Sequence, residues 1–250
     1  MSLRAVILAA GAGTRMKSDL PKPLHEVCGK AMVLHVIDAL EISQPLDICV
    51  VVGHGGDQVA EVVSALAPSW ANVTFATQHE QHGTGHATQV GLTGLTQPAE
   101  GDAVIVLAGD TPLLTGATIH RLVEDHVTNS RSATILTSEL DDPTGYGRIV
   151  RAADDSVQRI VEQRDASPDE LLIKEWNAGV YVFEHALLSP ALEQLGTNNS
   201  QGEYYLTDAI AYLAQGGKVG AVTTHADETV GVNDREQLAA VEQMMIARDG

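Results

Sequence analysis

The chain has 250 residues, of which 44% are hydrophobic and 19% charged, and its formal net charge is −18. This length suffices for one large α/β domain or two small ones. The acidic balance argues against nucleic acid or a membrane surface as the main partner, and no apolar run is long enough for a membrane span. The first thirty residues differ, with five Lys or Arg against two Asp or Glu. That basic segment can attract a small polyanion.

The two cysteines, Cys28 and Cys49, stand in neither a CxxC nor a metal-ligand pattern. The N-terminus also lacks the basic leader and long apolar region of a signal peptide. We therefore interpret both cysteines as reduced core residues of a cytoplasmic protein rather than as a disulfide pair. The oligomeric state stays open.

Apolar runs rich in strand formers alternate with helical patterns, which predicts an α/β fold with a mostly parallel central sheet covered by helices. In the first half, strands are expected at residues 4–10, 47–52, 73–77, 103–107 and 133–139. Helices are expected at residues 30–42, 57–66, 85–95 and 117–128.

The rhythm changes after Asp142. Short β segments at 148–151 and 157–162 predict a hairpin-like β insertion over the site, and a strand at 180–183 returns to the sheet. Helices at 205–214 and 234–248, with a strand at 218–224 between them, complete the chain. Because no repeat and no Pro/Ser-rich linker interrupts it, we expect a single domain spanning residues 1–250.

The first strand ends in a glycine loop that contains Gly11 and Gly13. Glycines allow a tight turn that brings backbone N–H groups close to phosphate oxygens, and Arg15, Lys17 and Lys22 follow. Met16 stands where a dinucleotide fingerprint needs its third glycine, and the Walker pattern is absent. The pattern favours a triphosphate-binding loop, with a plain surface turn as the alternative.

Residues 8–16 (LAAGAGTRM) and 19–24 (DLPKPL) resemble the signature of the sugar-phosphate nucleotidyltransferases. More narrowly, residues 5–235 resemble the N-terminal uridyltransferase domain of the bacterial GlmU family. Its members are bifunctional N-acetylglucosamine-1-phosphate uridyltransferases and glucosamine-1-phosphate acetyltransferases. The resemblance implies a Rossmann-like three-layer fold and Mg²⁺-assisted uridylyl transfer from UTP to a sugar 1-phosphate, giving a cell-wall precursor.

The resemblance also divides the chain and assigns its site. Residues 1–140 would form the nucleotide-binding half, 141–235 the sugar-binding half, and 234–248 a C-terminal helix. Arg15 and Lys22 would be catalytic. The implied nucleotide-binding residues are Leu8, Ala9, Ala10, Gly11, Gly13, Lys22, Gln78, Gly83, Thr84 and Asp110. From the residues themselves, the Gln78 amide can pair with a base edge and Thr84 can cap a helix, although an ordinary turn is equally compatible.

Asp110 ends an apolar strand, where a carboxylate can hold Mg²⁺ together with substrate phosphates. The resemblance supplies Asn233 as the second metal ligand. Asp234 departs from the asparagine usual in the family; it could alter ion binding or serve as the N-cap of the last helix. The ten histidines are interpreted as loop or packing residues rather than as metal ligands.

The implied sugar-binding residues are Gly147, Glu162, Asn177, Tyr205 and Thr207. A carboxylate and an amide suit hydroxyl recognition, whereas glycines around Tyr146 are also compatible with a routine turn. The family often has His-Lys after the glutamate, and this chain has Gln163 and Arg164 there. We interpret Glu203 as part of a helix start.

A sugar 1-phosphate oxygen is ionised at neutral pH, so attack on the α-phosphorus requires no general base and no covalent intermediate. One alternative is the same chemistry on another sugar or nucleotide; another is a non-catalytic nucleotide-sugar sensor. A dehydrogenase is disfavoured by Met16. The family continues into a hexapeptide-repeat acetyltransferase domain that is not found before Gly250, so acetyltransferase activity is not expected of this chain.

Overall fold

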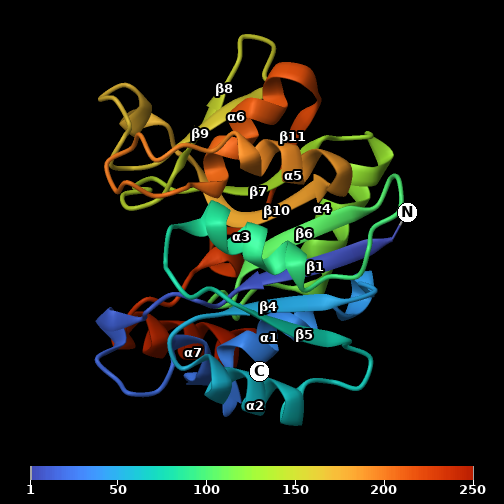
Figure 1. Cartoon of the computed structure of the whole chain (residues 1–250). Coiled ribbons are helices and arrows are strands. Elements are labelled where there is room, and N and C mark those ends of the chain that lie inside the picture. Colours follow the sequence, from blue (N-terminus) through green and yellow to red (C-terminus); the bar gives the residue numbers. More distant parts are fainter. Residues whose placement is uncertain (1, 250) are drawn as a thin grey trace.

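A nine-stranded, mostly parallel sheet organises the computed structural model, which describes residues 2–249, the last of them by its backbone alone (Figure 1). Across residues 2–249 the main path runs β11–β7–β10–β6–β1–β4–β5. These strands are β1 (Leu3–Leu8), β4 (Ile48–Val52), β5 (Val73–Thr77), β6 (Ala103–Ala108), β7 (Ala133–Glu139), β10 (Glu175–Glu184) and β11 (Val219–Thr223). β1 is parallel to β4 and β6, and only β10 is antiparallel to its neighbours on this path.

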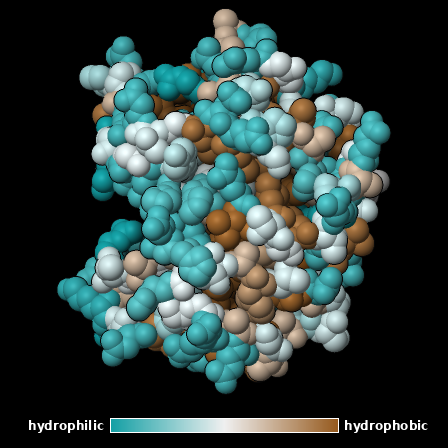
Figure 2. All heavy atoms as spheres, viewed as in Figure 1, coloured by the Kyte–Doolittle hydropathy of each residue, from teal (hydrophilic) through white to brown (hydrophobic). Residues whose placement is uncertain are grey.

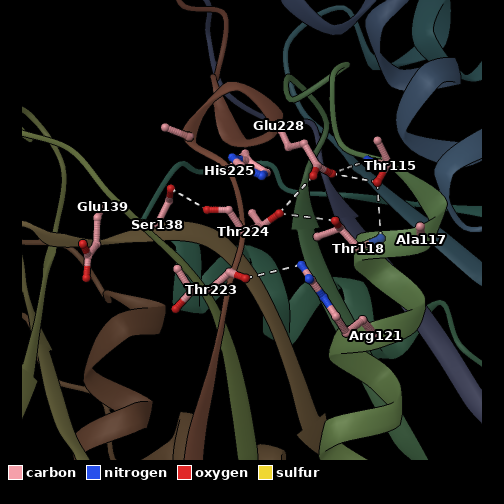
Figure 3. A pocket seen from close by; sticks show the side chains of 11 residues that line it. Thr115, Ala117, Thr118, Arg121, Ser138, Glu139, Thr223, Thr224, His225 and Glu228 are labelled. Carbon is pink, nitrogen blue, oxygen red and sulfur yellow. Dashed lines mark hydrogen bonds between the residues drawn. The ribbon is translucent and has the colours of Figure 1, made fainter. Parts of the chain in front are cut away.

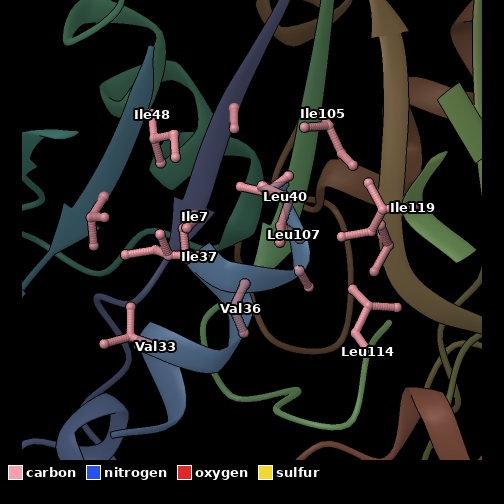
Figure 4. Packing of buried hydrophobic residues seen from close by; sticks show 14 of the residues in the cluster. Ile7, Val33, Val36, Ile37, Leu40, Ile48, Ile105, Leu107, Leu114 and Ile119 are labelled. Carbon is pink, nitrogen blue, oxygen red and sulfur yellow. The ribbon is translucent and has the colours of Figure 1, made fainter. Parts of the chain in front are cut away.

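Both faces of the sheet are covered by helices, which explains why its strands are continuous apolar runs. Along β1, Ala5 and Ile7 join one core cluster and Val6 joins the other, as the two-residue period of a strand requires. The first face packs on α1 (Met32–Ala39), α2 (Gly56–Leu66) and α4 (Gly116–Thr128). Figure 4 shows Val33, Val36 and Ile37 of α1 close to the sheet residues of this cluster. The second face packs on α3 (Thr84–Thr93), α5 (His185–Glu193) and α6 (Leu206–Gly216). The three-layer α/β prediction is confirmed.

The predicted insertion is a hairpin of β8 (Arg148–Arg151) and β9 (Val157–Val161), attached to β10 where Trp176 pairs with Arg148. At the other end, α7 (Arg235–Asp249) packs its Val241 and Met245 on a third cluster. That cluster includes Val27 of the small ribbon β2 (Glu26–Val27) and β3 (Lys30–Ala31). The C-terminal helix is thereby held against the segment that follows the glycine loop.

Several expectations need correction. α5 was not predicted, because Pro190 inside it reads as a helix breaker. β10 begins at Glu175 rather than 180, because a register shift between Asn177 and Tyr181 interrupts its alternation. Cys28 is exposed, with a positive φ of 51°, and is not a core residue; Cys49 is buried, and both are free. No helix within residues 2–249 combines the length and apolarity that crossing a bilayer needs.

Candidate active site

A cavity of about 450 Å³ opens at the carboxyl ends of β1 and β6. Ligands of open α/β sheets bind at this edge, because the loops that follow parallel strands converge there. Figure 2 shows the flank where these strands end as a hollow between two lobes. The lining residues are Leu8, Ala9, Ala10, Gly11, Ala12, Lys22, Pro23, Gln78, Gln81, Gly83, Thr84, Ala87, Ala108, Gly109, Asp110 and Glu203. Of the predicted nucleotide-binding residues, Gly13 alone is not part of this lining.

Gly13 instead shapes the loop. Its φ is +60°, and a Cβ there would lie 2.7 Å from the Cβ of Lys22. Only glycine therefore allows the 3₁₀ turn η1 (Thr14–Met16) and the turn η2 (Lys22–Leu24) to approach this closely. The close approach brings the Lys22 side chain to the cavity wall.

Four residues from three separate parts of the sequence meet beside the cavity. The Lys22 ammonium forms an ion pair with Oδ2 of Asp110 and donates to Oδ1 of Asn233 at 3.0 Å. Arg15 Nη2 donates to the same Asn233 oxygen at 2.9 Å. The backbone N–H of Val232 donates to the Asp110 carbonyl at 2.9 Å, which anchors the Asn233 segment to the end of β6. The structure thus brings the predicted catalytic and metal residues together.

The oxygen atoms that contact Lys22 are suitable ligands for a hard divalent cation. A carboxylate oxygen of Asp110 and an amide oxygen of Asn233 converge on one nitrogen, and oxygen is the ligand that Mg²⁺ prefers. No group of three His, Cys, Asp or Glu side chains in residues 2–249 is arranged to hold a metal ion. With only two protein oxygens, the remaining ligands would be waters or substrate phosphates.

Asp234 caps the last helix, a role that the asparagine usual in the family could also fill. Its Oδ1 accepts the backbone N–H of Gln237 at 2.9 Å, as the N-cap of α7 does. Gln237 Oε1 in turn accepts the N–H of Asn233 at 2.7 Å. The Asp234 carboxylate therefore stabilises the first turn of α7, and Gln237 in that turn fixes the backbone of Asn233.

The loop before α3 is tightly constrained. Gly83 has a φ of +105°, and a Cβ there would lie 2.6 Å from the Tyr204 carbonyl. The Gln78 amide is buried; its nitrogen donates to the Gly83 carbonyl at 3.3 Å and lies 3.0 Å from His86 Nδ1. The prediction that Thr84 caps the helix is wrong. Thr84 is the first residue of α3, and its Oγ1 accepts the N–H of Leu206 at 3.0 Å instead.

Most of the predicted sugar-binding residues lie together beneath the β8–β9 hairpin. Thr207 Oγ1 donates to Glu162 Oε1 at 3.0 Å, and a Cβ on Gly147 would lie 3.5 Å from Glu162 Oε2. The Asn177 backbone N–H donates to the Gly147 carbonyl at 2.9 Å. Tyr205 is buried, and its hydroxyl accepts from Gln201 at 2.8 Å rather than from a member of this cluster.

The electrostatics of this cluster act on Glu162. Burial raises the pKa of its carboxyl, the Thr207 hydrogen bond lowers it, and the nearby carboxylates of Asp208 and Asp165 raise it further. Glu162 is therefore protonated at a higher pH than an exposed glutamate.

Sequence reasoning missed two residues. Glu203, which was interpreted as part of a helix start, lines the cavity, and the residue that caps α6 is Tyr205, without a side-chain bond. Tyr181 is buried, and its hydroxyl accepts from Asn177 Nδ2 at 2.6 Å. Nothing in the apolar run around Tyr181 signals its hydrogen bond with Asn177. The polar run around Glu203, however, could have indicated a residue of the cavity lining.

A larger cavity of about 590 Å³ lies beside α4, and Figure 3 shows its polar wall. Glu228 accepts hydrogen bonds from Thr115 Oγ1 at 2.7 Å and from Thr224 Oγ1 at 3.0 Å. Thr115 also caps α4 by accepting the N–H of Thr118. These groups satisfy one another, so they brace the segment between β11 and α7 that carries Asn233.

A mostly parallel sheet between two helix layers, with a cationic glycine loop beside a strand-end carboxylate, is the arrangement expected of a nucleotidyltransferase. The chain matches the MobA-like NTP transferase domain over residues 5–215, and it belongs to that family. Nucleotidyltransferases generally use a divalent metal and bind a nucleotide substrate.

Individual relatives agree with this assignment. The bifunctional protein GlmU of Clostridium beijerinckii is 49% identical over 242 residues, which are 96% of this chain and 51% of that protein. GlmU of Streptococcus suis is 49% identical over 249 residues, covering 98% and 52%. The chain thus spans about half the length of the curated relatives it matches. A Bacillus anthracis structure described as a glucose-1-phosphate thymidylyltransferase aligns with a TM-score of 0.78 at 20% identity, covering 97% of this chain and 95% of that one, and supports the fold alone.

Proposed function

We propose that the chain is a cytoplasmic enzyme that transfers a uridylyl group from UTP to N-acetylglucosamine 1-phosphate and releases pyrophosphate. The observation that carries the proposal is the meeting of Lys22 and Arg15 with Asp110 and Asn233 at a glycine-lined cavity. The similarity to GlmU proteins supports the choice of nucleotide and sugar. We assign the whole chain to one nucleotidyltransferase domain, with residues 1–140 serving the nucleotide and 141–235 the sugar.

In this proposal the glycine loop and the start of α3 bind UTP. Backbone N–H groups around Gly11 and Gly13 face the phosphates, and Arg15 and Lys22 neutralise the charge that accumulates during transfer. The loop from Gln78 to Thr84 surrounds the uracil. Because the Gln78 nitrogen donates inside the protein, its amide oxygen is the atom left for the base.

Asp110 and Asn233 would hold Mg²⁺, which supplies charge neutralisation and orientation of the triphosphate when bound. Glu162, Asn177 and Thr207 would bind the sugar and its N-acetyl group, with Gly147 leaving room for the ring and Tyr205 supporting the wall. This division lets the sugar phosphate approach the α-phosphorus of UTP from the side opposite the leaving pyrophosphate.

The reaction then proceeds by in-line attack of the sugar phosphate oxygen on the α-phosphorus, with pyrophosphate leaving on the opposite side. The attacking oxygen is already ionised, so the residues of the chain act by positioning and by charge stabilisation rather than by proton transfer. No covalent intermediate is formed.

The test is a matrix of nucleoside triphosphates against sugar 1-phosphates in the presence of Mg²⁺, with pyrophosphate release as the readout. The proposal expects the highest kcat/KM for UTP with N-acetylglucosamine 1-phosphate. A higher kcat/KM for another pair would reassign the substrates within the same chemistry. Binding of UDP-sugar without any pyrophosphate release would instead identify a sensor.

A further inference from the structure

The Lys22 ammonium lies where a metal ion would take its two protein ligands. Nζ contacts Oδ2 of Asp110 and Oδ1 of Asn233 at once, and the Lys22 and Asp110 side chains are only 14% and 24% exposed. The negative charge of Asp110 is therefore already neutralised, and the Asn233 oxygen already hydrogen-bonded, by a cation that belongs to the chain. A divalent ion that takes the same two oxygens must displace this ammonium, because two cations at one position repel each other strongly in a partly buried site.

We propose that Lys22 is the resident counter-ion of the metal site, and that it gives up Asp110 and Asn233 only when a triphosphate offers it new oxygens. Lysine suits this exchange, since its ammonium is a compact charge on a flexible stem. The backbone of Lys22 stays beside the glycine loop, as its close approach to Gly13 requires, so the side chain can turn from the carboxylate to a phosphate. The inference rests on the proposed nucleotidyltransferase function.

The exchange predicts that metal and nucleotide bind cooperatively. Without nucleotide, the ion competes with Lys22 and binds weakly. With triphosphate present, Lys22 pairs with phosphate and the carboxylate becomes free, so each ligand favours the binding of the other. Lys22 therefore weakens metal binding when no nucleotide is present, whereas during uridylyl transfer it stabilises the charge on the phosphates.

The experiment measures Mn²⁺ binding to the nucleotide-free chain by electron paramagnetic resonance, because Mn²⁺ accepts the same oxygen ligands as Mg²⁺. Lys22→Met removes the charge and keeps the length of the side chain, and we expect it to bind Mn²⁺ about tenfold more tightly than the wild type. Lys17→Met is the matched control. Lys17 lies five positions earlier and is exposed, so it tests whether the gain reflects net charge alone.

Asp110→Asn in the Lys22→Met background should abolish the gain. Equal or weaker Mn²⁺ binding by Lys22→Met, or an equal gain in Lys17→Met, would overturn the exchange. If Asp110→Asn leaves the tight Mn²⁺ binding intact, the metal assignment in the proposed function is wrong as well. Circular dichroism checks folding, and Lys22→Gln repeats the measurement if Lys22→Met does not fold.

Discussion

The Oγ1 atom of Thr84 accepts a hydrogen bond from the backbone N–H of Leu206 at 3.0 Å, across 122 residues of sequence. The bond joins the first residue of α3, beside the proposed nucleotide cavity, to the first residue of α6, which precedes the proposed sugar residue Thr207. A second bond, from the Gly85 N–H to the Tyr204 carbonyl at 2.8 Å, links the same two segments. The walls of the two proposed substrate sites are therefore held together directly.

Thr84→Val should loosen this connection. The substitution keeps the side-chain shape but removes the acceptor, and a lost hydrogen bond of this kind costs about 1 kcal/mol of unfolding free energy. We expect a fall of about tenfold in kcat/KM for uridylyl transfer, because misplacing a substrate wall by a fraction of an ångström lowers the rate. Steady-state kinetics and urea unfolding measure the two effects.

Thr88→Val is the matched control, since the Thr88 hydroxyl donates to the Thr84 carbonyl within α3 and does not reach α6. It should lose similar stability and keep kcat/KM near the wild-type value. Equal loss of activity in both variants would mean that the Thr84–Leu206 bond has no special role.

Gly83→Ala should damage both stability and nucleotide binding. Gly83 has φ +105° and ψ 178°, a backbone region essentially limited to glycine, and an added Cβ would lie 2.6 Å from the Tyr204 carbonyl. The backbone strain alone costs about 1–3 kcal/mol. Thermal unfolding and UTP binding by calorimetry measure the result.

Gly101→Ala separates strain from collision. Gly101 also has a positive φ, +79°, but a Cβ there meets nothing within 4 Å. It should be destabilised by backbone strain alone and should bind UTP normally. If Gly101→Ala and Gly83→Ala lose equal stability, close packing against Tyr204 is not what requires glycine at position 83.

Asp110→Asn should lower turnover by about 10²–10³-fold, comparable to the loss of a preorganised charge contact in other active sites. The amide keeps the shape but cannot neutralise Lys22 or a divalent cation. Asp38→Asn is the control, because Asp38 also pairs with a lysine, Lys30, in a pair that is not part of the cavity lining. Near wild-type turnover in Asp110→Asn with normal folding would remove Asp110 from the mechanism.

The sequence predicts this site unevenly, for physical reasons. The long apolar strands are recognisable because both their faces are buried, and Asp110 is recognisable because it follows one of them. Asn233 could be reached only by resemblance, since its contact with Lys22 depends on how α7 docks. The Thr84–Leu206 bond could not be predicted, because a hydroxyl has no sequence signal for a partner 122 residues away. The helix α5 was missed for a different reason. Pro190 is a strong local signal against a helix, but the packing of Leu188 and Leu192 in the core overrides it.

Asp208→Asn should shift the pH dependence of sugar binding. The pKa of Glu162 is raised by burial and, among its charged neighbours, first by Asp208. If ionised Glu162 accepts sugar hydroxyls, KM for the sugar phosphate rises as the pH falls through that raised pKa. Removing the Asp208 charge lowers the pKa of Glu162 and moves this rise in KM to a lower pH. Ionisation of the substrate phosphate is common to both proteins, so the difference between their KM profiles reports on the enzyme.

His126→Asn should reduce the loss of stability in acid. Burial lowers the pKa of His126 from 6.5 to about 4, although Asp125 opposes this shift, and its Nδ1 lies 3.2 Å from Thr134 Oγ1. A lowered folded-state pKa means that the unfolded chain takes up the proton first. The wild type should therefore lose stability as the pH falls from about 6.5 to about 4, by about 3 kcal/mol at the low end for this group.

Asparagine can keep a bond to Thr134 but does not titrate. The unfolding free energy of the variant, measured by urea unfolding at each pH, should therefore fall less steeply over this window. Parallel curves for the two proteins would show that His126 does not contribute to acid sensitivity.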